Sequence, residues 1–591
     1  MRDILFQYEQ IELSTWFYLS SLLLIAFFFK FNRVLSVRNL DLLLLILLTP
    51  GLLLVNAGRQ VAQDVQDQGT TRSTVGSMDP ETRVKEILND KTGGSDPSSQ
   101  NGTFEPARTN EEASVPLVES TMTASEQGVD VSMSQARSQI QSGRDLQRTG
   151  FIWLFGVGGL LLIRLLVDPT MVRRPLLEPN LTTGSMIFLI LFFFMFWATN
   201  VVLKQAPPEN LQGPITAARL MAGEASDYDG LERNGPGYAV LFTLPMFRDS
   251  GIEPETTPDG KESPLVFRWR IMNTALPKEL SVDTRSEVDA KGYREIVAGY
   301  AGADQGQVSF KVAELDLFQI PLDMLEPSSR KHVELFGRCE RLAKFIAIGS
   351  HLAVLLAMIA IGYWHFHNIK MGIAPGLIYL MLPYTLQMTV RVDHLLPAAL
   401  LIWAFVFYRK PLLSGLLLGF ATGVIYYPLF LLPLWISFYW QRGLARFLIG
   451  WLAMLVALFT ALFFASADWI DFWDHTHKIL GLAPPHSLDL EGIWGLGWPP
   501  VYRFSVLAAF VAVSGSLAIW PGQKNLGTLM CCTGAVMVAT QFWHGYGGGL
   551  YLAWYLPSLL LTVFRPNLED RISTAVLRGS WPQRRKQNLA R

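Results

Sequence analysis

Residues 411–440 read PLLSGLLLGFATGVIYYPLFLLPLWISFYW, an apolar run without a single charged side chain. A helix needs roughly 20 apolar residues to cross the hydrocarbon core of a bilayer, because all its backbone groups must be hydrogen-bonded within the segment. The run is too long for one crossing, and Gly423 and Pro428 interrupt it near its centre. This stretch therefore predicts two short helices that form a hairpin.

Apolar runs of spanning or nearly spanning length lie on both sides of this hairpin. They cover residues 15–32, 39–56, 150–167, 184–203, 342–363, 372–389, 393–408, 444–466, 503–520, 526–543 and 549–565. With the hairpin, they predict an all-α polytopic membrane protein with about 13 helical segments. The 591 residues are 50% hydrophobic and only 17% charged, with a net charge of -1, which excludes a disordered chain and a nucleic-acid-binding protein. No nucleotide-binding loop, HExxH or CxxC motif is present, so no nucleotide partner is expected.

The distribution of basic residues predicts the topology, because cytoplasmic loops collect Lys and Arg. One set of alternate turns, with the tail, collects 19 basic against four acidic residues, provided that 411–440 crosses twice or re-enters the membrane. These residues are Lys30, Arg33, Arg38, Arg164, Arg173, Arg174, Lys370, Arg409, Lys410, Arg442, Arg446, Lys524 and the arginines and lysine of the tail from Arg565 onward. We therefore expect a multi-pass protein of the inner or plasma membrane with an extracytoplasmic N-terminus and a cytoplasmic C-terminus.

The polar segments divide the chain into six parts. They are a two-helix membrane segment (1–56), a disordered acidic extracytoplasmic loop (57–149) with an amphipathic helix near 133–149, two transmembrane helices (150–203), an extracytoplasmic loop domain (204–341), a C-terminal transmembrane bundle (342–565) and a basic cytoplasmic tail (566–591). The loop 57–149 is too polar to bury a core. The loop 204–341 contains β-compatible runs such as SPLVFRWRIMN and GQVSFKV, which predict a small mixed α/β insert.

Two groups of polar residues near the extracytoplasmic helix ends are candidates for substrate binding. Arg391, Asp393 and His394 share one short turn, where the arginine could hold a phosphate and the other two could handle a proton; the alternative is an interfacial ion pair that caps a helix. His544 follows the next-to-last span in QFWHGYGGGLYLAWYLP, whose glycines permit either a ligand to approach closely or a tight turn between helices.

Two further groups are candidates for catalysis and for metal binding. Asp227 and Asp229 form a carboxylate pair that could supply a general base, although DYDG is also an ordinary turn sequence. In the aromatic loop 467–502, carboxylates and imidazoles could hold a divalent metal ion, against the alternative of a solvated acidic loop. The candidate ligands are Asp471, Asp474, His475 and His477.

The order of features over roughly 184–565 resembles the integral-membrane GT-C glycosyltransferases, of the mannosyltransferase-like type that uses polyprenyl-phosphate sugars. A short polar turn, a span ending in Arg409 and Lys410, the glycines of GLLLG, a broken hairpin with prolines and a second basic turn occur in the family's order. Two features depart from the family pattern. The nearest aspartate after span 184–203 is Asp227, and Tyr426 and Tyr427 occupy the hairpin position where relatives often carry lysine.

The resemblance implies an inverting sugar transfer from a polyprenyl-phosphate donor to an extracytoplasmic acceptor. Asp227 or Asp229 would deprotonate the acceptor hydroxyl and Arg391 would steady the leaving phosphate. His544 and the 471–477 cluster would contact substrate or metal. The alternative is a non-catalytic scaffold or transport-type membrane protein whose ectodomain binds a partner. Ionisable residues in mid-membrane, which transport predicts, are few in this sequence.

Overall fold

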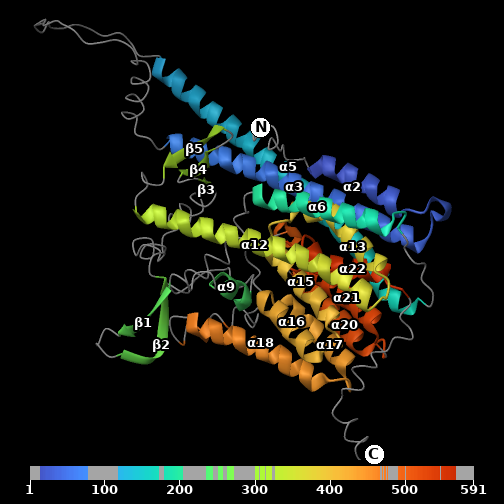
Figure 1. Ribbon diagram of the computed structural model, residues 1–591. Coiled ribbons are helices and arrows are strands. Elements are labelled where there is room, and N and C mark those ends of the chain that lie inside the picture. The colour runs from blue at the N-terminus through green and yellow to red at the C-terminus, as the bar shows by residue number, and fades with distance from the viewer. Residues whose placement is uncertain are drawn as a thin grey trace, which may run out of the picture. The chain divides into compact units, whose positions relative to one another are not determined.

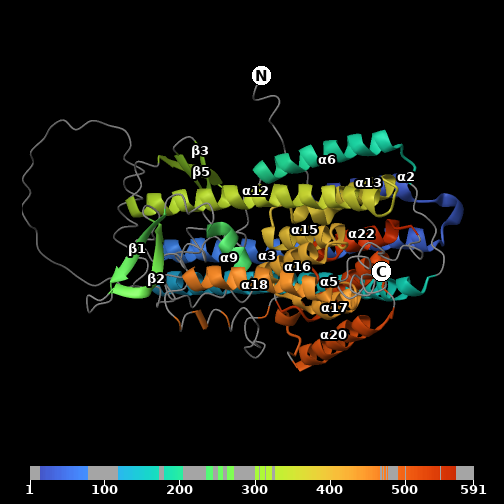
Figure 2. The ribbon, with the colours of Figure 1, turned by 60° about the horizontal axis from the view of Figure 1, so that its bottom comes forward.

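The computed structural model describes most of the apolar chain and part of the polar loops. The described residues are 13–76, 117–171, 179–203, 235–243, the five strands between 250 and 321, 327–465, 469, 472, 473, 476, 490, 492–499, 501–522, 524–545 and 547–566. The chain separates into two compact units, one formed by Met1–Leu53 with Gly150–Arg591 and one by Leu54–Thr149. The larger unit contains the helical bundle shown in Figures 1 and 2.

The described residues confirm an all-α polytopic membrane protein. Seven of their helices are long and apolar enough to cross a bilayer, and shorter apolar helices complete the bundle. The helices are α2 (Leu13–Phe28), α3 (Val37–Gly76), α5 (Leu117–Val167), α6 (Thr183–Leu203), α9 (Pro236–Thr243), α12 (Pro327–Trp364), α13 (Lys370–Met381), α14 (Pro383–Gln387), α15 (Val392–Val406), α16 (Pro411–Val424), α17 (Leu432–Tyr439), α18 (Leu444–Ala465), α20 (Val501–Ile519), α21 (Leu526–Trp543) and α22 (Leu556–Phe564). The predicted hairpin is α16 and α17, joined through the 3-10 helix η5 (Tyr427–Leu431).

Four helices of the bundle lie side by side in the order α12, α15, α16 and α18 (Figures 1 and 2). The contact between α16 and α18 is especially close, because glycines at every fourth position of α16 face the backbone of α18. A Cβ atom at Gly419 would lie 2.7 Å from the carbonyl oxygen of Trp451, and one at Gly415 would overlap the carbonyl oxygen of Phe447. The motif Gly415-xxx-Gly419 thus allows two membrane helices to pack backbone against backbone, and Gly423 makes room for the side chain of Leu458.

Two predicted spans are interrupted in the structure. The run 372–389 divides into α13 and α14 at Leu382, which has an extended backbone (φ -66°, ψ 134°) and precedes Pro383. This follows from the steric clash that drives the residue before a proline out of the helical region. The run 549–565 begins with Gly549, two further non-helical residues and the 3-10 helix η7 (Leu552–Trp554), so its α-helix starts only at Leu556.

The loop 57–149, predicted as mostly disordered, is helical at both described ends. Helix α3 continues past its apolar span Val37–Val61 to Gly76, and α5 begins at Leu117, well before its apolar span Ser138–Thr170. A helix that is already nucleated in the membrane is extended cheaply, because each added residue gains a hydrogen bond without a new nucleus. Within the smaller unit Gly58 faces α5, where a Cβ atom would lie 2.5 Å from the carbonyl oxygen of Gly143.

Strands occur only within the predicted insert, as far as the described residues extend. Strand β1 (Ser250–Thr256) pairs antiparallel with β2 (Glu262–Ile271), with Ser250 opposite Ile271. Strands β3 (Tyr300–Asp304), β4 (Gln307–Val312) and β5 (Leu315–Pro321) form an antiparallel sheet in that order. The β-compatible sequences SPLVFRWRI, QVSFKV and LDLFQIP therefore form strands, as their composition indicated.

The helix connections place different chemistry at the two ends of the bundle. We call one end the basic end, because it carries Arg164, Arg409, Arg442 and Arg565, where α5, α15, α17 and α22 finish. The opposite end, where α15 and α22 begin and α16 and α21 finish, is called the aromatic end. The sequence predicts that the basic end is cytoplasmic and the aromatic end extracytoplasmic.

Candidate functional site

The turn before α15 holds an ion pair with fork geometry. Arg391 occupies the N-cap position with an extended backbone (φ -75°, ψ 96°), and Asp393 lies in the first helical turn, where a negative charge suits the helix dipole. The Arg391 Nε donates to Asp393 Oδ1 at 3.0 Å and Nη2 donates to Oδ2 at 2.8 Å. Both side chains are largely buried, at 15% and 11% exposure. The predicted ion pair is therefore formed, although the Arg391 side chain makes no capping hydrogen bond to α15.

The neighbouring imidazole of His394 is held by a tyrosine. The Tyr384 hydroxyl lies 2.8 Å from His394 Nδ1 and accepts the backbone N–H of Ala553 at 3.0 Å. A hydroxyl that accepts from a backbone amide satisfies its own proton by donating to Nδ1, which favours the proton of a neutral imidazole on Nε2. His394 Nε2 lies 3.8 Å from Asp393 Oδ2.

Five rings form a continuous stack at the aromatic end. Successive ring centroids are 4.1 Å apart for Tyr426 and Tyr427, 4.5 Å for Tyr427 and His544, 4.5 Å for His544 and Tyr551, and 4.2 Å for Tyr551 and His394. These rings come from η5, the C-cap of α21, the segment before η7 and the first turn of α15. The stack therefore joins both predicted binding groups, around Arg391 and at His544, in one cluster.

Trp554 closes the side of this stack. Its ring centroid lies 4.4 Å from that of Tyr551, 5.1 Å from that of Tyr427 and 5.6 Å from that of His544. Its indole Nε1 donates to the backbone carbonyl of Asp393 at 3.1 Å. Because an indole has a single donor, this bond fixes the ring and ties η7 to the start of α15.

The glycine-rich segment after α21 is a tight turn that brings Tyr551 into the stack. Gln541 Oε1 accepts the backbone N–H groups of Gly549 at 3.1 Å and Tyr551 at 3.2 Å. Gly549 has φ +97°, which side chains rarely tolerate, and a Cβ atom at Gly548 would overlap the carbonyl oxygen of Gln541. Of the two uses predicted for these glycines, the structure shows the tight turn.

A second arginine reaches the same end from α20. Arg503 Nε donates to the backbone carbonyl of Trp543 at 2.9 Å, and a Cβ atom at Gly545 would lie 2.8 Å from Arg503 Nη2. The glycine therefore leaves room for the guanidinium beside His544. With Arg391 and Arg503, the aromatic end carries two arginines near the imidazoles, which is a suitable donor set for an anionic group.

One buried histidine inside the bundle escaped the sequence analysis. His351 of α12 is 3% exposed, with Nδ1 2.9 Å from the Tyr379 hydroxyl and Nε2 3.2 Å from the carbonyl oxygen of Thr389. Its ring also lies 5.5 Å from that of Trp197. A histidine within an otherwise apolar span was the available signal, because ionisable residues in membrane helices are rare and usually functional.

The sequence analysis also missed Tyr384, Gln541, Tyr551, Trp554 and Arg503. The aromatic residues carried no distinctive signal, because tyrosine and tryptophan are common at the ends of membrane helices. The tyrosines at 426 and 427 were noticed only because they replace an expected lysine. Arg503 did carry a signal, because it lies at the start of α20, at the end of the bundle opposite the one where most of the arginines near the spans collect.

Several predicted site residues lie outside the described residues. This applies to the proposed bases Asp227 and Asp229 and to the proposed metal ligands Asp471, Asp474, His475 and His477. Among the residues that the structure describes, no group of three or more His, Cys, Asp or Glu side chains is positioned to hold a metal ion. The catalytic and metal-binding roles therefore stay predictions.

Comparisons with known proteins do not assign a family to this architecture. No family model, curated protein or solved structure matches the chain. What the sequence and the fold establish is a multi-pass helical membrane protein with a cluster of arginine, imidazole and aromatic side chains at one end of its bundle.

Proposed function

We propose that the chain is a GT-C-like glycosyltransferase that moves a sugar from a polyprenyl-phosphate donor to an extracytoplasmic acceptor. The single observation that carries the proposal is the ring stack, which joins Arg391, Asp393 and His394 to His544 at the end of the bundle opposite the basic turns. An enzyme that takes its donor from the membrane needs its polar groups at this position, where the apolar carrier stays in the bilayer while the phosphate reaches the interface.

The described side chains suggest separate roles at this site. Arg391 and Arg503 would bind the donor phosphate and neutralise the charge that develops as it leaves. Asp393 is paired with Arg391, so it orients that arginine and is a poor candidate for the base. His394 and His544 would contact the sugar or acceptor hydroxyls. The base that removes the acceptor proton would be Asp227 or Asp229, so that the acceptor oxygen attacks the anomeric carbon and the lipid phosphate departs.

A second candidate function is a non-catalytic scaffold that binds a partner through its ectodomain. The observation that favours it is the length of α3 and α5, which continue as helices well beyond their apolar spans. Helical arms of this kind present a surface away from the membrane, which sugar transfer at the aromatic end does not need.

Labelled donors distinguish the two functions. The full-length protein in lipid nanodiscs would be incubated with radiolabelled polyprenyl-phosphate sugars, and release of polyprenyl phosphate would be measured. We expect turnover by the natural sequence, a loss of about tenfold or more for Arg391→Lys, which keeps the charge but loses the planar fork, and no loss for the matched Arg446→Lys at the basic end.

The base is tested by Asp227→Asn and Asp229→Asn, one of which should abolish transfer while donor binding persists. Absence of hydrolysis and transfer with every donor, beside an active control enzyme, would overturn the transferase proposal and favour the scaffold. Equal losses of turnover for Arg391→Lys and Arg446→Lys would instead show that the activity does not depend on the aromatic end.

A further inference from the structure

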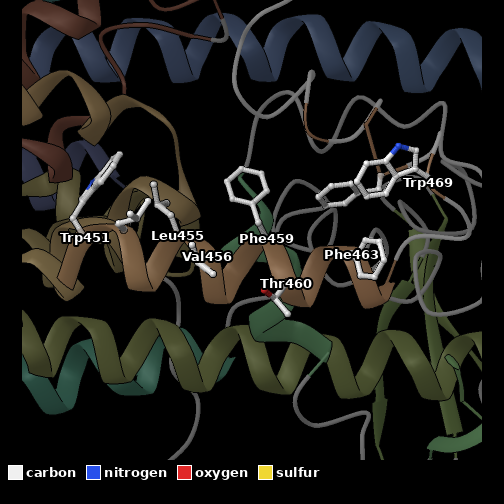
Figure 3. Close-up of a pocket in the computed structure, with 9 residues that line it drawn as sticks. Trp451, Leu455, Val456, Phe459, Thr460, Phe463 and Trp469 are labelled. Atoms are coloured by element: carbon white, nitrogen blue, oxygen red, sulfur yellow. The ribbon is translucent and has the colours of Figure 1, made fainter. Parts of the chain in front are cut away.

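A histidine in the interior of the bundle contacts the turn that carries Arg391. The pocket along α18 is lined by hydrophobic side chains and one threonine, Thr460 (Figure 3). Where α12 meets α13, by contrast, His351 is only 3% exposed and lies near the middle of the apolar span Glu340–Trp364. An ionisable side chain at that depth of a membrane helix is rare and is usually kept for a function.

The two hydrogen bonds of His351 define which nitrogen carries its proton. Nε2 lies 3.2 Å from the carbonyl oxygen of Thr389, which can only accept, so Nε2 is the donor. Nδ1 lies 2.9 Å from the Tyr379 hydroxyl, which can donate to it. A neutral ring with its proton on Nε2 therefore satisfies both partners, and His351 is a fixed hydrogen-bond donor to Thr389.

The carbonyl that His351 holds belongs to a β-turn that ends at Arg391. The Arg391 N–H donates to the carbonyl of Met388 at 3.1 Å, which leaves Thr389 and Val390 at the centre of the turn. The Thr389 carbonyl takes no part in that bond, and Thr389 and Val390 are 0% and 2% exposed. Water therefore cannot supply the donor that this carbonyl needs, and a buried carbonyl without one is costly. His351 thus stabilises the turn in its observed conformation.

The conformation of this turn sets the direction of the Arg391 side chain. Arg391 is the N-cap residue of α15, and its guanidinium donates to both oxygens of Asp393. Rotation of the peptide between Thr389 and Val390 would change the backbone just before Arg391 and would displace the guanidinium with it. A displacement of about 1 Å in a group that binds a substrate can lower a rate about a hundredfold.

A second histidine contacts the other end of α15 in the same way. His365, directly after α12, has its Nε2 2.9 Å from the carbonyl oxygen of Val406, the last residue of α15. One histidine of this part of the chain therefore holds each end of α15. Only His351 lies at the end where Arg391 and His394 are found, so His365 provides a matched control.

We propose that His351 is a positioning residue for Arg391. As the Nε2–H donor to Thr389, it fixes the turn 388–391 and so keeps the Arg391 guanidinium in the orientation that binds the donor phosphate. The role of Arg391 in this inference rests on the proposed transferase function. The contact between His351 and the turn does not.

Three substitutions separate the two hydrogen bonds of His351. His351→Gln places an amide donor about where Nε2 lies, the shorter His351→Asn extends only as far as Nδ1, and His351→Phe keeps the ring without either group. In nanodiscs we expect His351→Asn and His351→Phe to lower kcat/KM for a polyprenyl-phosphate sugar by about tenfold. His351→Gln and the control His365→Phe should stay within about twofold of the natural sequence.

The unfolding midpoint of each variant shows that it folds, and His351→Asn and His351→Phe serve as two independent ways to remove the bond to Thr389. Equal losses of kcat/KM for His351→Gln and His351→Asn would overturn the positioning role, and so would a loss for His365→Phe as large as that for His351→Phe.

A double variant tests whether His351 acts through Arg391. The combination of His351→Phe with Arg391→Lys should lose no more kcat/KM than Arg391→Lys alone, because the group that His351 positions is already altered. If the two losses multiply, His351 affects the activity by another route and the positioning role is overturned.

Chemical modification of Arg391 tests the inference without any turnover. Phenylglyoxal reacts with guanidinium groups, and the Arg391 side chain is 15% exposed and bound to Asp393. We expect modification of Arg391, mapped by mass spectrometry, to be about threefold or more faster in His351→Asn than in His351→Gln, because the unpaired turn releases the guanidinium. Modification of the exposed Arg446 should be the same in both variants.

The two kinds of measurement distinguish the two proposals. If the natural sequence shows no turnover but Arg391 is modified faster in His351→Asn, the transferase proposal fails and the contact of His351 with the turn still orients Arg391. If the natural sequence turns over the donor, and neither turnover nor modification differs between His351→Asn and His351→Gln, the positioning role alone is overturned.

Discussion

The two ends of the bundle are held together by different interactions. At the basic end, Asp168 accepts hydrogen bonds from Arg164 Nη1 at 3.0 Å and from Arg565 Nη2 at 2.6 Å. Arg164 also donates two hydrogen bonds to Asp41, at 2.7 and 3.0 Å. At the aromatic end, stacked rings and bonds to neutral groups predominate, with Arg391 and Asp393 as the ion pair that the structure shows there.

This difference in interactions indicates that the basic end is a structural junction between helices, whereas the aromatic end is a candidate functional site. The basic-end network joins α3, α5, η2 (Asp168–Thr170) and the residue after α22, and its charges compensate one another locally. Such a buried network specifies how the helices meet but offers little to a ligand. The aromatic end instead holds imidazoles and tyrosines in ring contact, which are groups that can donate and accept hydrogen bonds to a polar substrate.

The largest expected effect is the loss of Asp168. This carboxylate is fully buried, so Asp168→Asn leaves the buried Arg565 guanidinium without its carboxylate partner and leaves Arg164 paired with Asp41 alone. We expect a destabilisation of about 3–5 kcal/mol, measured as the shift of thermal or denaturant unfolding in detergent.

The exposed Asp145, which accepts from Gln141 Nε2 at 3.3 Å, gives the control: Asp145→Asn should change stability by no more than about 0.5 kcal/mol. If the two variants lose equal stability, the basic-end network is not a junction and the contrast between the two ends fails.

An intermediate effect is expected at the aromatic end from Tyr384→Phe. The substitution keeps the ring but removes the hydroxyl that His394 and the Ala553 N–H share, leaving both without that partner in a buried setting. The expected cost is about 1–3 kcal/mol in unfolding free energy.

Tyr363→Phe, at a tyrosine that is 62% exposed, is the matched control and should be close to neutral. A cost for Tyr384→Phe as large as that of Asp168→Asn would show that the aromatic end is as much a structural junction as the basic end.

The smallest effect concerns pH at the basic end. Burial lowers the pKa of His365, and the nearby positive charge of Arg409 acts in the same direction. The folded protein therefore binds a proton at this imidazole less readily than the unfolded chain, in which the imidazole is protonated below a pH of about 6.5. Stability from this group is complete above that pH and is lost as the pH falls below it.

His365→Phe should reduce the loss of unfolding midpoint between pH 7.5 and pH 5.5, because phenylalanine preserves the ring contact with Tyr408 and cannot be protonated. An identical pH dependence in the variant and the natural sequence would contradict the assignment. If His365 contributes only weakly to the loss of stability at acid pH, while Asp168→Asn is strongly destabilising, the Asp–Arg ion pairs are what hold the helices together at the basic end.

The elements that could be predicted were those with local causes. A membrane span can be recognised from its length and apolarity, and the break in 411–440 was predicted from Gly423 and Pro428. The grouping of Arg391, Asp393 and His394 was accessible because they are neighbours in the chain. The helix predicted near 133–149 lies within α5. The extension of α3 and the part of α5 before residue 133 were missed, since polar residues in a solvated helix resemble those of a loop.

The candidate site was only partly predictable for the same reason. Tyr384, Tyr551 and Trp554 look in sequence like any aromatic residues near the ends of membrane helices, whether they face lipid or each other. Their participation depends on partners far away in the chain, such as the bond from the Ala553 N–H to Tyr384, which joins residues 169 positions apart.

The sequence by itself determined a helical membrane protein, its spans and the concentration of basic residues on one side, because the bilayer imposes length, apolarity and charge rules on each segment separately. Only the tertiary structure decided which side chains meet. It brought Asp168 to Arg565 across 397 residues and placed the rings of His394 and His544 at 4.2 and 4.5 Å from that of Tyr551. Such contacts depend on how apolar helices pack against one another, and in a membrane many packings satisfy the same local rules.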